Sequence, residues 1–425
     1  MITSIPSFLK KHKYKVIFFC IILIHIFFRF YQLENRLQFT WDQVDNAWHA
    51  KNMLINKEYP LLGMQGKQSS GIFIGPFYYY FITFFYFLTN LDPIASGLAA
   101  GVTSLITFCV LFFVTKKIFS APIALVASFL YAISFYAIYS DRVQWPVNFI
   151  PVLSLGIFYA LYQIMLGKLK YLYLLMFLLG FSFHIHFTSI FYLPLILIAL
   201  PFFPRNKTTL VHALVASVLF LVWLVPLFLV SSAKESLPAH SLSSFLHNNY
   251  HGFHLRRFFQ IANDAFYEFQ NPLLFPVLYP LKFLFLPLFL FLYGMRKPSR
   301  EKTFFCYLLI MWIFIPWILF STYRGDLTDY YFSSIRLQVI IVVSYLALLL
   351  LKSKSKLFVG AFILLFCIYV LKNIQEFVTF KERGLGFYRQ KVLQDIKDGK
   401  GNEFTYGSPE TYLYYFYKRK FYGVE

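Results

Sequence analysis

Two carboxylates, Asp42 and Asp45, lie three residues apart in the stretch FTWDQVDNAWHAKNML (39–54), directly after a long apolar segment. If this stretch is helical, the two side chains lie close to one face of the helix. Such a pair suits general-base chemistry, in which a carboxylate takes a proton from a reacting group. The alternative is that both acids are solvated or cap a helix, an ordinary role for Asp near a helix start. The spacing alone leaves both interpretations open.

Other polar residues follow at later turns between apolar segments. Arg142 lies in SDRVQWPVNFIP, and His184 and His186 lie in LLGFSFHIHFTS. Taken singly, the arginine is a common kind of headgroup anchor, and the histidines are common satisfied core groups. Taken with the carboxylates, they supply a base, a clamp for phosphate and polar groups for a sugar, which are the requirements of sugar transfer from a lipid phosphate.

The elements that must position these residues are membrane helices. Of 425 residues, 59% are hydrophobic, 22% are aromatic and only 14% are charged, and the mean hydropathy is +0.60. This composition excludes an ordinary soluble domain. The net charge of +20 is spread over short loops between apolar runs, so we expect a lipid bilayer as partner and no nucleic acid. Basic loops of this kind indicate membrane topology.

The basic loops predict the orientation. Six of them share the cytoplasmic side if the run 171–203 crosses twice, turning near His184 and His186, and if GPFYYYFITFFYFL (75–88) does not cross. We therefore expect an all-α polytopic membrane protein with about eleven transmembrane helices. Its N-terminus is cytoplasmic, and its polar chemistry lies at the outer face of the cell (inner, cytoplasmic) membrane.

Three outer segments remain: a first outer loop over about 34–93 with juxtamembrane helices, a second large outer loop over 231–271, and residues 372–425. We expect residues 1–371 to form one transmembrane domain and residues 372–425 to form a small outer α/β appendage. The appendage sequence predicts an amphipathic helix, a turn, a short strand and an aromatic-rich helix. The four cysteines lie inside apolar runs and give no disulfide, zinc or nucleophile pattern.

Five short motifs in sequence order carry a family resemblance. They are DQVDNAWHAKNML, LLGMQGKQSSGIFIGPFYYY, LDPIASGLAA, IYSDRVQWPVNFIPVLSL and FSFHIHFTSIFYLP. Together they resemble the GT-C membrane glycosyltransferases of the protein O-mannosyltransferase and aminoarabinose transferase superfamily, particularly bacterial members of unassigned substrate. The resemblance implies a GT-C fold and an enzyme that takes a sugar from a polyprenyl phosphate at the outer membrane face.

The resemblance also implies roles for individual residues. Asp42 corresponds to the acidic base of the first outer loop, and Asp45 takes the part of the family's second acid, since Gln43 stands where the family has Glu. The residues implied at the donor phosphate are Arg142, Trp145 and Asn148, with Lys67 replacing a lysine that the family carries elsewhere. The residues assigned to the sugar or acceptor are His184, His186, Tyr78 and Tyr79.

The implied reaction is a single inverting displacement, with Asp42 as base and Arg142 at the departing lipid phosphate. The acceptor, a glycan, lipid or protein, is not specified. Two alternatives stay open: a polymerase or ligase of lipid-linked oligosaccharides, and a flippase-type transporter. His240, His247, His251 and His254 keep the polymerase open, because the second outer loop carries them. No metal ligand set is assigned, and a divalent cation is left open as the only cofactor.

Overall fold

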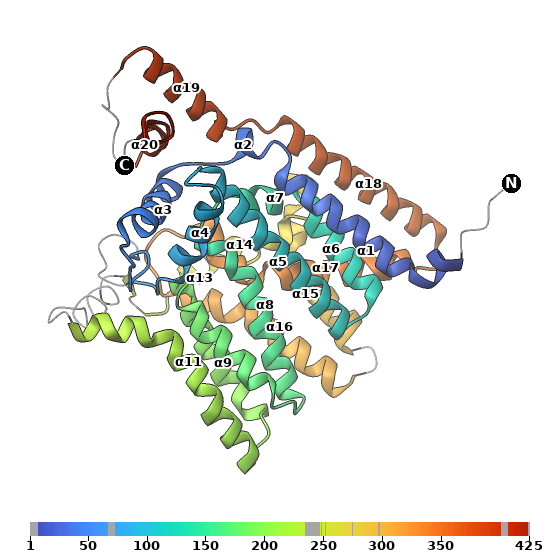
Figure 1. Ribbon diagram of the computed structural model, residues 1–425. Coiled ribbons are helices and arrows are strands. Elements are labelled where there is room, and N and C mark those ends of the chain that lie inside the picture. Colours follow the sequence, from blue (N-terminus) through green and yellow to red (C-terminus); the bar gives the residue numbers. More distant parts are fainter. Residues whose placement is uncertain are drawn as a thin grey trace.

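The computed structural model describes residues 7–66, 73–233, 247, 249–250, 252–273, 275–295, 298–400 and 407–423 (Figure 1). Helices of α, 3₁₀ and π type form nearly all of its regular structure. Pairing of extended backbone among the described residues is limited to two isolated bridges, Gln65 with Phe73 and Tyr250 with Tyr323. The predicted all-α class is therefore confirmed for the described part of the chain.

Seven helical segments of the described chain are long and apolar enough to cross a membrane, and a bent pair of helices makes an eighth. They are α5 (Ile94–Ile118), η2 (Pro146–Phe149) with α8 (Ile150–Met165), α11 (Lys207–Ala233), η6 (Pro276–Leu281) with α15 (Lys282–Phe289) and η7 (Leu290–Met295), α16 (Arg300–Ser321), η8 (Asp329–Ile335) with α17 (Arg336–Leu351), α18 (Lys356–Thr379), and the bent α6 (Ala121–Ile133) with α7 (Phe135–Arg142). A multi-pass membrane protein is thereby confirmed.

Further apolar helices complete the bundle. They are α1 (Ser7–Phe30), α9 (Tyr171–Ser182) and the run η3 (Phe187–Phe191), α10 (Tyr192–Ala199) and η4 (Leu200–Phe202). With the eight above, these three correspond to the eleven apolar runs that the basic loops predict to cross the membrane, although α9 and the run from η3 to η4 are shorter than the other candidate spans.

Helix α4 (Phe77–Leu88) has 12 residues, about 18 Å at 1.5 Å per residue, which is shorter than the about 30 Å hydrocarbon core. Helix α9 has the same length, so length does not decide between them. The number of crossings and their orientation stay predictions from the basic loops.

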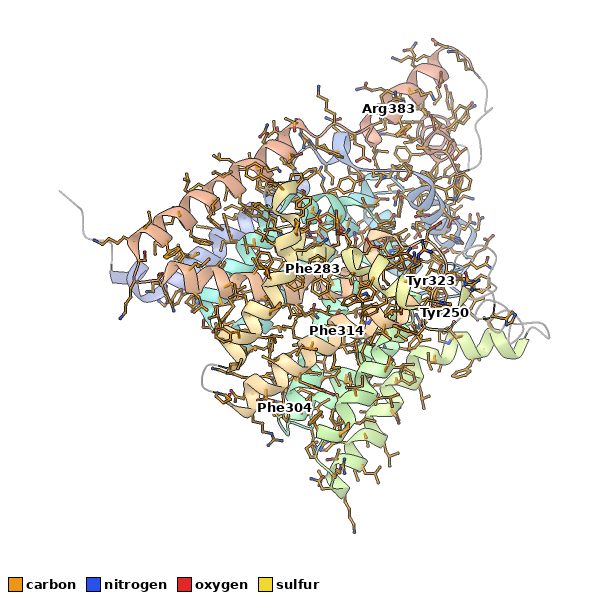
Figure 2. All side chains as sticks on the ribbon, turned by 180° about the vertical axis from the view of Figure 1, so that it is seen from behind. Tyr250, Phe283, Phe304, Phe314, Tyr323 and Arg383 are labelled. Atoms are coloured by element: carbon orange, nitrogen blue, oxygen red, sulfur yellow. The ribbon has the colours of Figure 1, made fainter. Side chains whose placement is uncertain are left out.

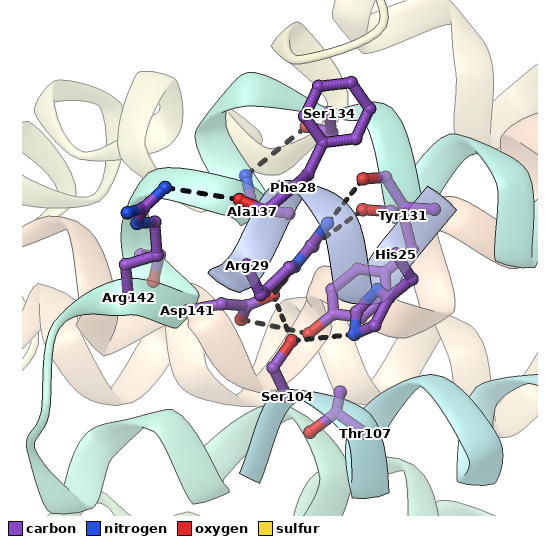
Figure 3. Close-up of polar contacts among 12 residues, drawn as sticks. His25, Phe28, Arg29, Ser104, Thr107, Tyr131, Ser134, Ala137, Asp141 and Arg142 are labelled. Atoms are coloured by element: carbon purple, nitrogen blue, oxygen red, sulfur yellow. Dashed lines mark hydrogen bonds and ion pairs between the residues drawn. The ribbon is translucent and has the colours of Figure 1, made fainter. Parts of the chain in front are cut away.

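The bend between α6 and α7 lies inside a continuous apolar run and measures 64°. Arg29, from the last turn of α1, donates to the backbone oxygens of Tyr131 and Ala132, which end α6. The same guanidinium pairs with Asp141 of α7 at 2.8 Å, as Figure 3 shows. Because the last carbonyls of a helix lack partners within the helix, a cation there stabilises the end of α6. The bend directs the end of α7 toward the outer elements.

The elements predicted to lie at the outer face gather at one end of the bundle (Figure 1). The first outer loop forms α2 (Leu33–Arg36), α3 (Trp41–Lys51), η1 (Asn52–Asn56) and α4, and the C-terminal appendage forms α19 (Leu385–Lys397) and α20 (Pro409–Tyr422). Helix α3 packs on α4, α20 packs on α3, and α19 packs on α2. Both predicted helices of the appendage are present, whereas its predicted strand falls at residues 401–406, outside the described residues.

The described part of the second outer loop forms α13 (Leu255–Gln260), α14 (Ala262–Ala265) and η5 (Tyr267–Gln270). It is held to the end of α16 by the bridge between Tyr250 and Tyr323, whose ring centroids are 5.4 Å apart (Figure 2). Of the four histidines of this loop, His240 and His251 lie outside the described residues, and His247 and His254 lie within them. No cluster of three or more potential metal ligands occurs within the described ranges.

Candidate functional site

Helix α3 begins with a capping box. Its N-cap is Thr40, whose backbone N–H donates to Oε1 of Gln43 at 3.1 Å. The other amide atom of Gln43 donates to the backbone oxygen of Gln144 at 2.9 Å. This bond ties the first turn of α3 to the segment between α7 and η2. Asp42 lies in that first turn, where the helix dipole favours a carboxylate.

Asp42, Asp45 and His49 lie on one face of α3 and are all partly exposed. Asp45 faces His49 at 3.8 Å between Oδ2 and Nε2. Burial raises the pKa of Asp42, and the charge of Asp45 raises it further. Burial also raises the pKa of Asp45, while the charge of His49 lowers it. The carboxylate of Asp42 makes no hydrogen bond with another described residue, so its lone pairs are available to accept a proton.

Tyr78 and Tyr79 of α4 form the wall behind this face. Both are buried. The hydroxyl of Tyr78 accepts a hydrogen bond from Nε2 of Gln144 at 2.7 Å, and burial, with the charge of Asp42 among the smaller causes, raises the pKa of Tyr78. The ring of Tyr79 stacks on His49 with centroids 4.0 Å apart. The structure thus places both tyrosines, predicted from the sequence to contact the sugar or acceptor, beside the carboxylates as packed wall residues.

Arg142 ends α7 and is buried. It donates to the backbone oxygen of Phe28 at 3.3 Å (Figure 3). It also donates to the backbone oxygen of Tyr31 at 3.0 Å, where α1 ends. Its Nε has no hydrogen-bond partner among the described residues. No hydrogen bond or ion pair joins Arg142 to Asp42 in the described chain.

Arg142 lines a narrow, largely apolar pocket of about 20 Å³, room for about one water molecule, between α2, α7 and the end of α18. The other polar residues of this pocket are Arg36, Gln38 and Glu382. Gln38 lies four residues before Asp42, so its Cα is at most about 14 Å from that of Asp42 even in fully extended chain. The pocket therefore opens close to the start of α3.

Trp145 and Asn148 bond to each other. The indole Nε1 of Trp145 donates to Oδ1 of Asn148 at 3.0 Å, and Nδ2 of Asn148 donates to the backbone oxygen of Ser140 at 3.1 Å. These bonds close the turn between α7 and η2. The Trp145 ring also packs on Tyr330 with centroids 5.3 Å apart.

The two predicted histidines have different surroundings. Nδ1 of His184 accepts from the backbone N–H of Phe77 at 3.4 Å, and its Nε2 lies 2.5 Å from the backbone oxygen of Trp223. His184 thereby joins α4 to α11. Nδ1 of His186 accepts from the N–H of Thr188 at 3.2 Å, and its ring packs on Tyr330. Burial lowers the pKa of His186 to about 4, so its ring is neutral near pH 7.

The position of the His184 ring between α4 and α11 requires glycine at position 75. A side chain at Gly75 would overlap the His184 ring, because a Cβ atom there would lie 2.2 Å from Nδ1. The last predicted site residue, Lys67, lies outside the described residues.

Buried charged residues outside the first outer loop escaped the sequence prediction. Arg336 pairs with Glu268 at 3.0 Å and also bonds to the hydroxyls of Ser140 and Tyr136 at 3.2 and 3.1 Å. It lies at the start of an apolar run, in the first turn of α17. A charged residue at the edge of an apolar run is a sequence feature that points to a functional or structural role. This feature could have identified both Arg336 and Arg29 from the sequence.

The chain is similar to known proteins in sequence over part of its length and in fold over most of it. The sequence family described as dolichyl-phosphate-mannose-protein mannosyltransferase matches residues 74–229. No curated protein matches the sequence.

Solved structures share the fold. The crystal structure of ArnT from Cupriavidus metallidurans bound to undecaprenyl phosphate superposes with a TM-score of 0.60 at 12% identity, covering 95% of this chain and 85% of that one. The archaeal oligosaccharyltransferase AglB from Archaeoglobus fulgidus, in complex with an inhibitory peptide and a dolichol-phosphate, gives 0.56 at 12% identity, covering 92% of this chain and 59% of that one. At these identities the similarity establishes the fold.

Proposed function

We propose that this chain, a member of the GT-C superfamily of membrane glycosyltransferases, transfers a sugar from a polyprenyl-phosphate carrier to an acceptor hydroxyl. The observation that carries the proposal is the partly exposed Asp42, unpaired by any hydrogen bond within the described chain, at the start of an outer-loop helix. Both similar proteins named above are described as bound to a polyprenyl-type lipid phosphate. A lipid-linked donor reaching the site through the membrane fits this architecture.

In the proposed reaction, a carboxylate oxygen of Asp42 removes the proton from the acceptor hydroxyl. The acceptor oxygen forms a bond to the anomeric carbon as the bond from that carbon to the phosphate oxygen breaks, and the configuration inverts. The lipid phosphate leaves with the bonding electrons. The raised pKa of Asp42 makes it a better proton acceptor once it is ionised.

We assign the lipid phosphate to the Arg142 pocket. The unpaired Nε of Arg142 is a donor for a phosphate oxygen. Trp145 and Asn148 shape this region through the turn that they close. The negative charge of Asp45 raises the pKa of Asp42 and so makes Asp42 a stronger base.

The test is Asp42→Asn, which nearly preserves shape but removes the base. We expect transfer in proteoliposomes from a polyprenyl-phosphate sugar to fall by about 10²–10⁴-fold, the usual contribution of a general base, while donor binding is retained. Glu58→Gln is the matched control, because Glu58 is an exposed acid of the same loop.

Near-normal turnover of Asp42→Asn would remove Asp42 from the role of base. Transfer by the wild type from lipid-linked oligosaccharides alone, with none from lipid monosaccharides, would identify a ligase or polymerase instead.

A further inference from the structure

Asn46 is a fully buried amide without partners. Its side chain has 0% exposure, and neither Nδ2 nor Oδ1 has a hydrogen-bond partner among the described residues. Buried amides are nearly always hydrogen-bonded, because leaving one unpaired sacrifices its interaction with water without replacement. An exception of this kind calls for a reason such as a ligand that completes the bonds.

The position of Asn46 relates it to the carboxylates. It follows Asp42 by four residues, which places it one turn further along α3 and about 40° round the helix axis at 100° per residue. Asp42 and His49, on either side of it along this face, are partly exposed. Asn46 is therefore a neighbour, on the buried side, of the partly exposed face that carries the proposed base.

A second incomplete amide lies at the same junction. Gln144 is fully buried, and its Oε1 has no hydrogen-bond partner in the described chain. Its other polar atoms are in use: Nε2 donates to the Tyr78 hydroxyl, and its backbone oxygen accepts from Gln43, the neighbour of Asp42. Two incomplete amides thus lie on elements that this junction joins, Asn46 on α3 and Gln144 on the segment that bonds to the first turn of α3 through Gln43.

We propose that Asn46 and Gln144 form a subsite for sugar hydroxyls next to Asp42. The free atoms are one donor group, Nδ2, and two acceptor atoms, Oδ1 and Oε1. A hydroxyl both donates and accepts, so it matches this set. A phosphate has only acceptor oxygens at its ionised positions and would face two carbonyl oxygens unfavourably. The inference rests on the proposed sugar transfer and adds the residues that recognise the sugar.

The competing explanation is a buried water or an unfavourable packing detail. The two explanations differ in what an apolar replacement does. Replacing an unpaired buried amide by an apolar side chain of similar shape stabilises the folded protein, since no bond is lost. If the amide binds a sugar hydroxyl, the same replacement also weakens substrate use, a trade of stability against function.

The experiment is Asn46→Leu in the full-length protein in proteoliposomes. We expect the thermal unfolding temperature without ligand to rise and the KM for the polyprenyl-phosphate sugar to rise about tenfold or more, the effect of one or two lost hydrogen bonds. Gln163→Leu is the matched control. Gln163 is a buried amide of α8 whose Oε1 is likewise unpaired, so its replacement should stabilise the fold and leave transfer unchanged.

Thermal shifts provide a readout independent of turnover. A panel of polyprenyl-phosphate hexoses and pentoses is compared with bare polyprenyl phosphate. Asn46→Leu should keep the stabilisation given by the bare lipid and lose the additional stabilisation given by the sugar.

A lowered unfolding temperature, or unchanged KM and sugar-dependent stabilisation in Asn46→Leu, would overturn the subsite. Failure of the wild type to transfer any sugar of the panel would instead overturn the proposed function.

Discussion

The charge of Asp45 acts on the proposed base through space. Transfer requires ionised Asp42, so the rate falls as the pH drops through the pKa of that residue. Because burial and Asp45 both raise this pKa, the rate should fall at a higher pH than an ordinary aspartate would give. Asp45→Asn removes the neighbouring charge, and we expect the acidic limb of kcat/KM to move to lower pH.

The measurement is a pH profile of kcat/KM for the wild type, Asp45→Asn and Glu58→Gln. Glu58→Gln should keep the wild-type profile. An acidic limb that stays in place, or moves to higher pH, in Asp45→Asn would show that the two carboxylates do not interact in the working enzyme.

Residues of the site differ in how far the sequence predicts them. Asp42 and Asp45 could be found because acids at the edge of an apolar run stand out chemically. Asn46 and Gln144 could not, because a neutral amide becomes informative only when the fold leaves it buried without partners. The sequence likewise could not show that Asn148 completes a turn, since that depends on the carbonyl oxygens that the turn brings near it.

At the scale of the helix, the pair of Arg29 and Asp141 holds the bend between α6 and α7. Tyr131 and Ser104 also donate to Asp141, at 3.0 and 2.7 Å. Arg29→Met leaves a buried carboxylate without its cation, and we expect it to lower the free energy of unfolding by about 3–5 kcal/mol. Arg29→Met with Asp141→Leu should recover much of this loss, because no unpaired charge then remains.

Thermal or denaturant unfolding in detergent, analysed as a double-mutant cycle, measures this coupling. Lys13→Met provides the control, as Lys13 is an exposed cation of the same helix. If the losses of the two single variants simply add in the double variant, the bend is held by other contacts.

The helices themselves were predictable where long apolar runs define them, as in α5 and α16. The bend was not, because Ser134 breaks a run that is apolar on both sides and the group that stabilises the break comes from α1. The double crossing predicted for residues 171–203 has a counterpart in the break between α9 and η3. That break follows from the turn that His184 and His186 occupy.

On the scale of the whole molecule, the C-terminal appendage contacts the first outer loop on both sides of α3. The hydroxyl of Tyr412 donates to the backbone oxygen of Leu91 at 3.0 Å, and its ring packs on Trp48 of α3. Arg389 pairs with Glu34 at 3.0 Å and also with Asp92. The sequence predicted an outer appendage but gave no indication of its partner, since these contacts join residues from opposite ends of the chain.

Tyr412→Ala should therefore loosen α3. Tyr412 has 0% exposure, and truncating a buried aromatic side chain typically costs about 3–5 kcal/mol. We expect faster hydrogen exchange in α3 and reduced transfer, with the membrane bundle unchanged. Tyr422→Ala is the control, because Tyr422 lies in the same helix at 64% exposure. Equal exchange in α3 for both variants would show that the appendage does not hold this helix.

The contact between the appendage and α3 also sets an order of events during synthesis. Helix α3 leaves the ribosome before helices α5 to α18, and α20, which packs on it, leaves after them. Helix α3, which carries the carboxylates, therefore stays unpacked by α20 while the spans between them in the sequence enter the membrane. A chain that stalls before α20 is made would carry the spans up to α18 and yet lack the packing that fixes α3, so the finished site can arise only after α20 has been translated.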